Sequence, residues 1–332
     1  MINLDKLFPP NSKRRKFAKN LLIEAQWVPR DISKNFKKID KSSFYLIRTS
    51  LEKNYFSQSH LQTEQGQEDL LEHLYRRLAM DRRFVAPWLN SVKHLKGCHI
   101  LEIGCGTGSS TVSLAEQGAK VTAIDILEKS LAVAKERCEI YGLDVEFHRA
   151  NATEAPKLFL NKHFDFIIFY ASLEHMTLDE RLDAMHATWE MLSPGALWCV
   201  IESPNRLWYY DSHTSLLPFY NWLPDELALK YSRFSPREHF KEQFQELTSE
   251  SQLAFLRLGR GISFHEFELA MKPLAALKVV SCMWLYNRKR NPLIWLKWRF
   301  SLEYKYDKIL SRISPGIHKG FLQPWLDLII EK

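Results

Sequence analysis

The glycine-rich segment Leu101–Ser110 constrains the fold of this chain more than any other feature. It reads Leu-Glu-Ile-Gly-Cys-Gly-Thr-Gly-Ser-Ser and lies between an apolar strand pattern and a helical pattern. Gly104, Gly106 and Gly108 permit a tight turn and let a ligand approach the main chain without meeting a Cβ atom. The segment therefore predicts a strand–loop–helix unit of an α/β protein, with a ligand bound above the end of the strand.

The spacing of these glycines differs from that of the dinucleotide-binding fingerprint. That fingerprint needs its third glycine at position 109, and this chain has Ser109 there. Glu102 stands two residues before the first glycine, where the strand ends. We expect its carboxylate to face the crevice above the strands and to suit a ligand that carries an amine or a positive charge. The order Glu-x-Gly-x-Gly-x-Gly resembles motif I of the class I S-adenosylmethionine-dependent methyltransferases.

Short apolar runs alternate with helical patterns from residue 96 to residue 202. We expect strands at 98–103, 120–126, 144–149, 164–170 and 196–202, and helices at 107–117, 127–141 and 177–192. The fourth strand is apolar throughout, as is typical of a central parallel strand. This alternation predicts βαβ units, a parallel sheet and helices on both of its faces.

Further motifs extend the resemblance over about 105 residues. Asp125 ends the second strand, 17 residues after Gly108, and in the family an acidic residue there bonds the ribose hydroxyls of the cofactor; dehydrogenases share this feature. Asn151-Ala152 is similar to the pair that contacts adenine. Leu173-Glu174-His175 resembles the Leu-Glu-His segment of ubiquinone-biosynthesis-type methyltransferases. The resemblance implies S-adenosylmethionine as cosubstrate, bound by Glu102, Gly104, Cys105, Gly106, Gly108, Asp125, Ile126, Asn151, Ala152 and Tyr170.

The resemblance also implies a complete fold, a Rossmann-like sheet of seven strands in the order 3-2-1-4-5-7-6 with the last strand antiparallel. Residues 277–285 and 325–330 supply the two late strands, although the helical segment 286–320 between them departs from the minimal fold. We expect four parts: a helical N-terminal cap over 1–95, a cofactor-binding core over 96–202, a substrate-binding insertion with helical and aromatic segments over 203–276, and the last strands over 277–332.

The helical cap is predicted from the apolar periodicity of residues 61–90. Five apolar residues are expected on one side of that helix: Leu70, Leu71, Leu74, Leu78 and Phe84. In the insertion we expect a helix over residues 234–257. Within the last part, residues 292–312 interleave Trp295 and Trp298 with Lys297, which suits either a helix packed on the sheet or one at a membrane interface.

The segment after the fifth strand resembles an insertion of uncharacterised bacterial methyltransferases, with the pattern Asn-Arg…His-Thr-Ser…Leu-Pro. Some members of that subgroup accompany genes of glycan and cell-envelope biosynthesis. Arginine matches carboxylate or phosphate groups bidentately, and aromatic rings stack on sugars, although surface ion pairs and core packing explain such residues equally. The substrate-binding residues expected here are Asn205, Arg206, Tyr210, His213, Trp222 and Glu266.

Three histidines are candidates for the base that removes a proton from an acceptor hydroxyl: His175, His213 and His265. Histidine suits this task near neutral pH. His175 follows the fourth strand, where open α/β folds bind ligands; capping of the next helix is its alternative. His213 lies in the insertion, and its alternative role is to stabilise its own turn by a local hydrogen bond. His265 and Glu266 form a possible pair, but adjacent residues of a helix point apart.

Charge is distributed unevenly over the chain. The net charge of +7 divides into +8 for residues 1–95, −6 for 96–200 and +5 for 201–332. Basic flanks indicate a solvated surface, an anionic carrier, a peripheral membrane contact or RNA. Five scattered cysteines indicate reduced thiols in a cytoplasmic compartment, and no spacing predicts a metal site. We expect neither a membrane span nor a signal peptide.

The leading interpretation is an enzyme that methylates a small or carrier-bound acceptor, with an oxygen atom of a glycan, envelope component or secondary metabolite preferred and nitrogen or carbon left open. An RNA methyltransferase is the enzymatic alternative. No RNA-binding module and no Asn/Asp-Pro-Pro-Tyr motif supports it, because Tyr170-Ala171-Ser172-Leu173 stands after the fourth strand. A non-catalytic scaffold that binds S-adenosylmethionine is the second alternative. The sequence does not indicate the oligomeric state.

Overall fold

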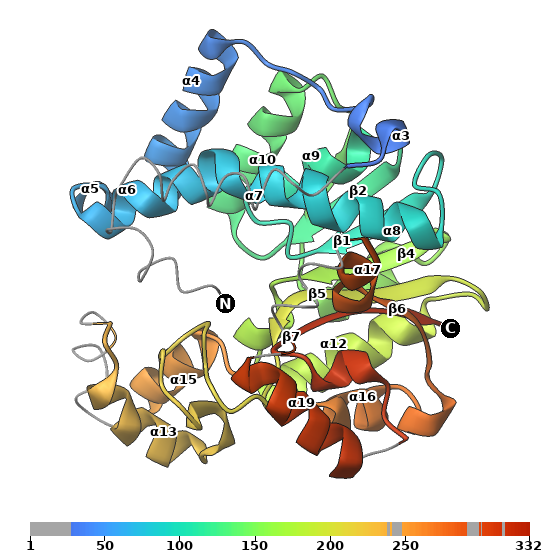
Figure 1. The fold of residues 1–332 in the computed structure, drawn as a ribbon. Coiled ribbons are helices and arrows are strands. Elements are labelled where there is room, and N and C mark those ends of the chain that lie inside the picture. Colours follow the sequence, from blue (N-terminus) through green and yellow to red (C-terminus); the bar gives the residue numbers. More distant parts are fainter. Residues whose placement is uncertain (1–27, 238–239, 241–247, 291–298, 300, 314–315) are drawn as a thin grey trace.

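The expected seven-stranded sheet is present in the computed structural model, which describes residues 28–237, 240, 248–290, 299, 301–313 and 316–332 (Figure 1). The strands lie in the order β3-β2-β1-β4-β5-β7-β6, as predicted. β7 is antiparallel to both of its neighbours, and β1 to β5 pair in parallel. The bounds are β1 His99–Ile103, β2 Lys120–Asp125, β3 Glu146–Arg149, β4 Phe166–Tyr170, β5 Leu197–Pro204, β6 Lys278–Cys282 and β7 Trp325–Glu331.

Both faces of the central strands are buried, which explains the unbroken apolar run of β4. Ile167 and Phe169 point into one core layer, and Phe166 and Ile168 point into the other. Because β-strand side chains alternate between the two faces, a strand covered on both sides must be apolar at every position. The first layer packs on α12 (Leu178–Glu190) and α16 (Phe264–Ala270), and the second on α8 (Ala86–Val92), α9 (Ser109–Ala115) and α10 (Glu128–Ile140).

The described part of the N-terminal cap, residues 28–95, is helical. Its helices are α3 Arg30–Ser33, α4 Lys41–Ser50, α5 Gln58–Leu61, α6 Glu64–Leu71, α7 Arg77–Met80 and α8. Side chains of Asp40, Ser57 and Thr63 cap α4, α5 and α6 by accepting backbone N–H bonds. Short π-helical turns at Leu51–Tyr55, Glu72–Arg76 and Asp81–Val85 interrupt the α-helical pattern.

The predicted apolar side of the cap is correct for three of its five residues. Leu70, Leu74 and Leu78 are buried, whereas Leu71 is 44% exposed and Phe84 is half-buried. Leu71 follows the buried Leu70 directly, and successive residues of a helix point about 100° apart. The placement of Leu71 on the buried side was therefore wrong.

The insertion contains α13 (Asp225–Tyr231), α15 (Ser249–Arg257) and α16, joined by 3₁₀ turns at Tyr220–Trp222 and Ser232–Phe234. In the view of Figure 1, α13 and α15 lie below the sheet, and the cap lies above it. The prediction of one helix over 234–257 was wrong at its start, because the backbone is extended at Ser235 (φ −59°, ψ 141°). Residues 238–239 and 241–247 of that prediction lie outside the described residues.

The edge of the sheet forms despite the long helical segment between its last two strands. β6 ends at Cys282, opposite Leu328 of β7, and not at residue 285 as predicted. The chain then turns into α17 (Met283–Arg290), whose Met283 and Tyr286 pack against the core. Of the expected helix over 292–312, α19 (Leu302–Ile313) is described, whereas Trp295, Lys297 and Trp298 lie outside the described residues. Among the helices that the structure describes, none has the length and apolar character needed to span a bilayer.

Candidate functional site

A cavity of about 530 Å³ lies at the carboxyl ends of the parallel strands. Open α/β sheets bind their ligands at this edge. The glycine loop and the ends of β2 and β3 line one part of the cavity, and residues of the cap and the insertion line the rest. Ten of the lining residues are Gly104, Cys105, Gly106, Asp125, Ile126, Asn151, Ala152, Tyr170, His175 and His213. All ten were predicted from the sequence as site residues.

The glycine loop needs its glycines for two different reasons. Gly104 and Gly108 have φ near +80°, and a Cβ on Gly104 would lie 2.5 Å from the Cβ of Ser172. A Cβ on Gly108 would lie 2.9 Å from the Cα of Ala134. Gly106 also has a positive φ of 51°, but a Cβ there would meet nothing within 4 Å. Gly104 and Gly108 are therefore required for packing of the loop against its neighbours, whereas the absence of a side chain at Gly106 leaves space in the cavity.

Asp125 is held at the end of β2 by two backbone amides. Its Oδ2 accepts from the amide of Gly106 at 2.9 Å, and its Oδ1 accepts from the amide of Leu127 at 2.8 Å. Burial raises the pKa of the carboxyl despite these bonds. Each oxygen keeps a lone pair, so the carboxylate is positioned to accept from hydroxyl groups of a ligand.

Asn151 lies on the cavity wall, and its side-chain oxygen is already a hydrogen-bond acceptor. Its Oδ1 accepts from the amide of Thr153 at 3.1 Å, and the carboxylate of Glu154 accepts from the amide of Asn151 at 2.7 Å. This reciprocal capping box begins the 3₁₀ turn Ala152–Glu154. The backbone of this turn and the side chain of Ala152 are thereby fixed beside the cavity.

Glu102 does not face the cavity, which corrects the prediction for its carboxylate. The side chain is fully buried and accepts hydrogen bonds from the hydroxyls of Ser110 and Thr111 in α9. Burial raises its pKa to about 7. The strand end turns this side chain under the glycine loop, where it joins β1 to α9 and cannot reach a ligand amine.

Tyr170 connects the sheet to the cap. Its hydroxyl donates to the carboxylate of Asp81, and it lies 3.4 Å from Oε1 of Glu202. Burial and the neighbouring Glu202 raise the pKa of Asp81 well above its usual value. Ala171 and Glu202 have φ of 41° and 57°, a conformation that non-glycine residues rarely adopt. Strained backbone therefore occurs where β4 and β5 reach the cavity.

Four residues of the cap also line the cavity and were not predicted from the sequence: Tyr55, His73, Arg77 and Asp81. Three of them lie in the π-helical turns of the cap, which are frequent at functional sites. His73 makes a 3.1 Å contact between its Nδ1 and Oγ1 of Thr107 in the glycine loop. Burial lowers the pKa of His73 to about 3, so its ring is neutral. The sequence pattern shows neither π-turns nor the docking of the cap over the sheet edge.

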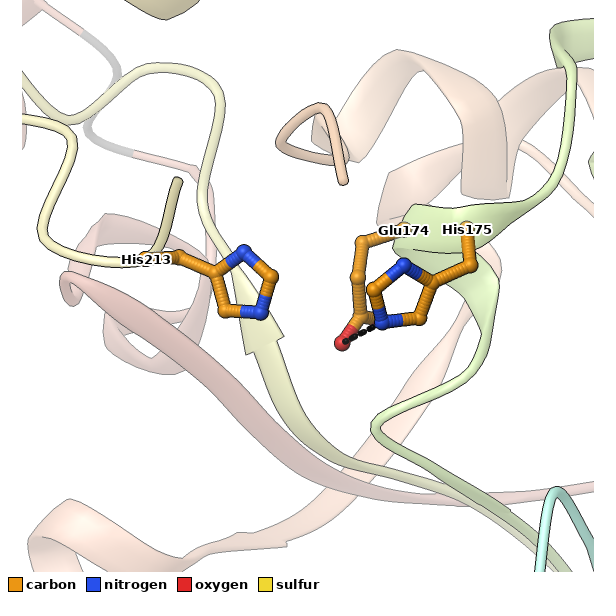
Figure 2. A group of neighbouring side chains, drawn as sticks. All are labelled: Glu174, His175 and His213. Carbon is orange, nitrogen blue, oxygen red and sulfur yellow. Dashed lines mark ion pairs between the residues drawn. The ribbon is translucent and has the colours of Figure 1, made fainter. Parts of the chain in front are cut away.

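Two predicted histidines, His175 and His213, lie close together (Figure 2), and both line the cavity. His175 comes from the 3₁₀ turn Leu173–His175 after β4, and His213 comes from the insertion. Their ring centroids are 5.7 Å apart, and His213 packs edge-on against Trp325 of β7 at 5.8 Å. Glu174 lies beside them, fully buried, with its Oε1 at 3.9 Å from Nε2 of His175. We call Glu174, His175 and His213 the histidine cluster.

The loop that carries His213 is held rigidly. Asp211 accepts backbone bonds from His213, Thr214 and Ser215 at 2.7 to 3.1 Å. A Cβ on Gly259 would lie 2.7 Å from the His213 ring, so this glycine lets the ring approach the backbone. Burial and the neighbouring His175 lower the pKa of His213 to about 4.

His265 and Glu266 are not part of the cavity, and their predicted roles are corrected. His265 is exposed and stacks on Phe264 with ring centroids 4.2 Å apart. Glu266 is buried and forms a 2.6 Å ion pair with Arg181 of α12, while it also caps α16. Since successive side chains of a helix diverge, one points outward and the other into the α12–α16 contact.

The remaining predicted substrate residues also lie away from the cavity lining. Asn205 is buried and donates to the carbonyls of Phe321 and Gln323, each at 2.7 Å, so its amide holds the insertion to the chain before β7. Three others lie outside the residues that line the cavity: Arg206, Tyr210 and Trp222. Tyr210 and Trp222 are exposed at the surface of the insertion.

Comparison with known proteins supports the architecture. A family model described as a methyltransferase domain matches residues 100–195. The ubiquinone biosynthesis O-methyltransferase of Azoarcus sp. is 33% identical over 108 residues, which are 32% of this chain and 45% of that protein. Its counterpart from Aromatoleum aromaticum is 38% identical over 92 residues, 27% of this chain and 38% of that protein. The chain therefore spans less than half the length of these relatives.

A solved structure covers a larger share of the chain at lower identity. The magnesium protoporphyrin IX methyltransferase of Synechocystis PCC 6803, with bound SAM, is 22% identical and has a TM-score of 0.36. The match covers 51% of this chain and 79% of that one. The family match and the strand order together confirm the expected class I methyltransferase fold.

Proposed function

We propose that this chain, in which residues 100–195 match a methyltransferase domain, transfers the methyl group of S-adenosylmethionine to an oxygen atom of a small or carrier-bound acceptor. The observation that carries the proposal is a single cavity that two different groups of residues line. One group is the glycine loop with Asp125, which we assign to the nucleoside end, and the other is the pair of imidazoles of His175 and His213, which we assign to the acceptor end.

The first end suits the nucleoside. The open backbone at Gly106 accommodates the ligand, and Asp125 accepts from the ribose hydroxyls. The turn at Ala152 borders the adenine. Arg77 of the cap lines the same cavity and supplies a cation for the carboxylate of the methionine moiety.

The second end suits the acceptor. Methyl transfer is an in-line displacement, in which a lone pair of the acceptor oxygen forms the bond to the methyl carbon while the carbon–sulfur bond electrons stay on sulfur. Orientation in a closed site contributes about 7–11 kcal/mol to such a reaction. A hydroxyl acceptor must also lose its proton, and either imidazole of the histidine cluster is placed to receive it.

An oxygen acceptor is preferred because the curated relatives carry the name O-methyltransferase. The basic flanks, +8 over residues 1–95 and +5 over 201–332, favour an acceptor with an anionic carrier. The same flanks favour RNA as the second candidate. Binding of tRNA or rRNA that falls steeply with salt would support an RNA acceptor, and absence of binding would exclude one.

Calorimetry with S-adenosylmethionine and S-adenosylhomocysteine, followed by turnover assays over hydroxylated acceptors, tests the proposal. We expect micromolar binding of both nucleosides and release of S-adenosylhomocysteine with at least one acceptor class. Binding without turnover over the whole panel would instead indicate a scaffold. Binding of NADH in place of both nucleosides would refute the proposal.

A further inference from the structure

The histidine cluster contains three hydrogen-bond acceptors that face one another. The Oε1 atom of Glu174 is buried and has no hydrogen-bond partner among the described residues, whereas its Oε2 accepts from Ser203 Oγ at 3.0 Å. A buried carboxylate oxygen without a donor is costly, because the oxygen has lost water and gained nothing in exchange. Such an atom indicates that a cation or a donor belongs beside it.

The hydrogen bonds of the two rings determine where their lone pairs lie. Nδ1 of His175 is 2.8 Å from the carbonyl oxygen of Arg257. A carbonyl only accepts, so Nδ1 of His175 carries the proton and Nε2 has a bare lone pair.

His213 reaches the same state by a different route. Its Nδ1 is 2.8 Å from Oγ1 of Thr214, and that hydroxyl lies 2.7 Å from the carbonyl oxygen of Gly259. Thr214 donates its single proton to that carbonyl and therefore accepts from Nδ1 of His213. Nε2 of His213 is left bare as well.

The ligand atoms of the cluster converge. One oxygen of Glu174 and one ring nitrogen of each histidine lie within 4.8 Å of one another. Figure 2 shows the carboxylate of Glu174 and the ring of His175, which follow β4, beside the ring of His213, which belongs to the insertion. Lone pairs that face each other repel unless a positive charge lies between them.

We propose that Glu174, His175 and His213 bind a divalent transition-metal ion such as Zn²⁺. Two imidazole nitrogens and one carboxylate oxygen form a donor set that such ions accept, with further positions open to a substrate. Hard ions such as Mg²⁺ and Ca²⁺ prefer oxygen ligands throughout. Both Nδ1–H groups already donate to protein oxygens. A histidine that binds a metal through one ring nitrogen usually donates the N–H of its other nitrogen in the same way.

This inference rests on the proposed function and specifies how the acceptor is activated. The acceptor hydroxyl binds the ion through its oxygen, which lowers the pKa of that hydroxyl, and the proton leaves to water. The resulting alkoxide attacks the methyl carbon, and the carbon–sulfur bond electrons remain on sulfur. In the metal-loaded enzyme the imidazoles act as ligands, and the ion takes over the role of the base.

Metal binding is tested on the full chain, freed of any affinity tag and stripped with EDTA. Titration with Zn²⁺ by calorimetry is expected to give one tight site, and Co²⁺ is expected to give the visible absorption of a nitrogen-containing site. His175→Ala and His213→Ala should each weaken Zn²⁺ binding at least about 100-fold. His265→Ala, an exposed histidine outside the cavity, is the matched control and should bind as the wild type does.

Glu174→Gln is a further variant, and because Glu174 is buried its folding is checked by circular dichroism. Should this variant misfold, the two histidine variants decide the result alone. Equal Zn²⁺ affinity in wild type, His175→Ala and His213→Ala, or no tight site at all, would overturn the inference.

The same samples separate this inference from the proposed function. Methyl transfer that persists in EDTA, with no Zn²⁺ bound, would refute the metal site and support the methyltransferase function. A tight Zn²⁺ site that depends on both histidines, in a chain that binds no S-adenosylmethionine, would support the metal site and refute the methyltransferase.

Discussion

The backbone amide of Gly106 donates a 2.9 Å hydrogen bond to Oδ2 of Asp125, which joins the glycine loop after β1 to the end of β2. The two residues are 19 positions apart in the sequence and meet because β1 and β2 are parallel neighbours. The bond orients a carboxylate toward the cavity and holds the loop in the conformation that leaves the cavity open.

Asp125→Ala should weaken binding of S-adenosylmethionine by about 10- to 100-fold. A hydrogen bond to a charged group contributes about 1.5–3 kcal/mol, and each 1.4 kcal/mol is a factor of ten. Calorimetry measures the dissociation constant. Glu128→Ala is the control, because this exposed residue at the start of α10 pairs with Arg149 outside the cavity. An unchanged constant in Asp125→Ala would contradict the ribose assignment.

Gly104→Ala, Gly106→Ala and Gly142→Ala should separate folding from binding. All three glycines have positive φ, so each alanine is strained by about 1–2 kcal/mol. Only Gly104→Ala adds a clash, with Ser172, which should cost a further 1–3 kcal/mol or so. Urea unfolding measures these losses.

Gly106→Ala should lose about as much stability as Gly142→Ala, since a Cβ meets nothing within 4 Å at either position. Its binding of S-adenosylmethionine should nevertheless fall by at least about tenfold, because the methyl group occupies cavity space. Normal affinity in Gly106→Ala would show that the nucleoside binds elsewhere.

Glu102 should make the protein more stable at mildly acidic pH. Its pKa is about 7 in the folded chain, against the ordinary value of 4.5 for a glutamate side chain, so the folded state holds this proton more tightly. The contribution is complete below pH 4.5, falls as pH rises toward 7 and is lost above it. The full span is about 3 kcal/mol. Unfolding free energies measured from pH 5 to 8 should therefore slope less in Glu102→Gln, which carries no titrating group; an identical slope would refute the assignment.

Glu266→Gln should reduce stability by about 3–5 kcal/mol, because it leaves Arg181 buried without its charge partner. The KM for the acceptor should not change at a temperature where the variant is folded, since Glu266 is outside the cavity. The control is Glu331→Gln, which breaks the exposed pair with Lys278 and should cost under about 1 kcal/mol. A raised KM with unchanged stability would return Glu266 to the substrate site.

The cofactor end of the cavity was predictable from the sequence because its residues lie in loops directly after strands. Gly104 and Gly106 follow β1, Asp125 ends β2 and Asn151 follows β3, and the carboxyl ends of these parallel strands meet at one edge of the sheet. Glu102 shows the limit of this reasoning. The residue is at the strand end as expected, but alternation along β1 and two hydroxyls of α9 turn its carboxylate inward.

The acceptor end was only partly predictable. His175 and His213 were candidates from their positions, as were His265 and Glu266. The only argument against the second pair was that adjacent residues of a helix point apart. The packing of α16 on α12 turned Glu266 toward Arg181 and left His265 exposed. The cap residues His73 and Asp81 gave no signal, because their positions depend on π-helical turns and on helix docking.

The amino-acid sequence by itself determined the alternation of strands and helices and the glycine loop at the end of the first strand, since both follow from local periodicity and glycine conformations. The order of the seven strands and the nucleoside ligand were implied by the resemblance to the methyltransferase family. Only the tertiary structure decided how the insertion and the cap close the cavity. The meeting of Glu174 and His175 with His213 depends on contacts between segments that are remote along the chain, and on hydrogen bonds that leave particular lone pairs bare. Such contacts arise from packing and are not encoded in any single stretch of residues.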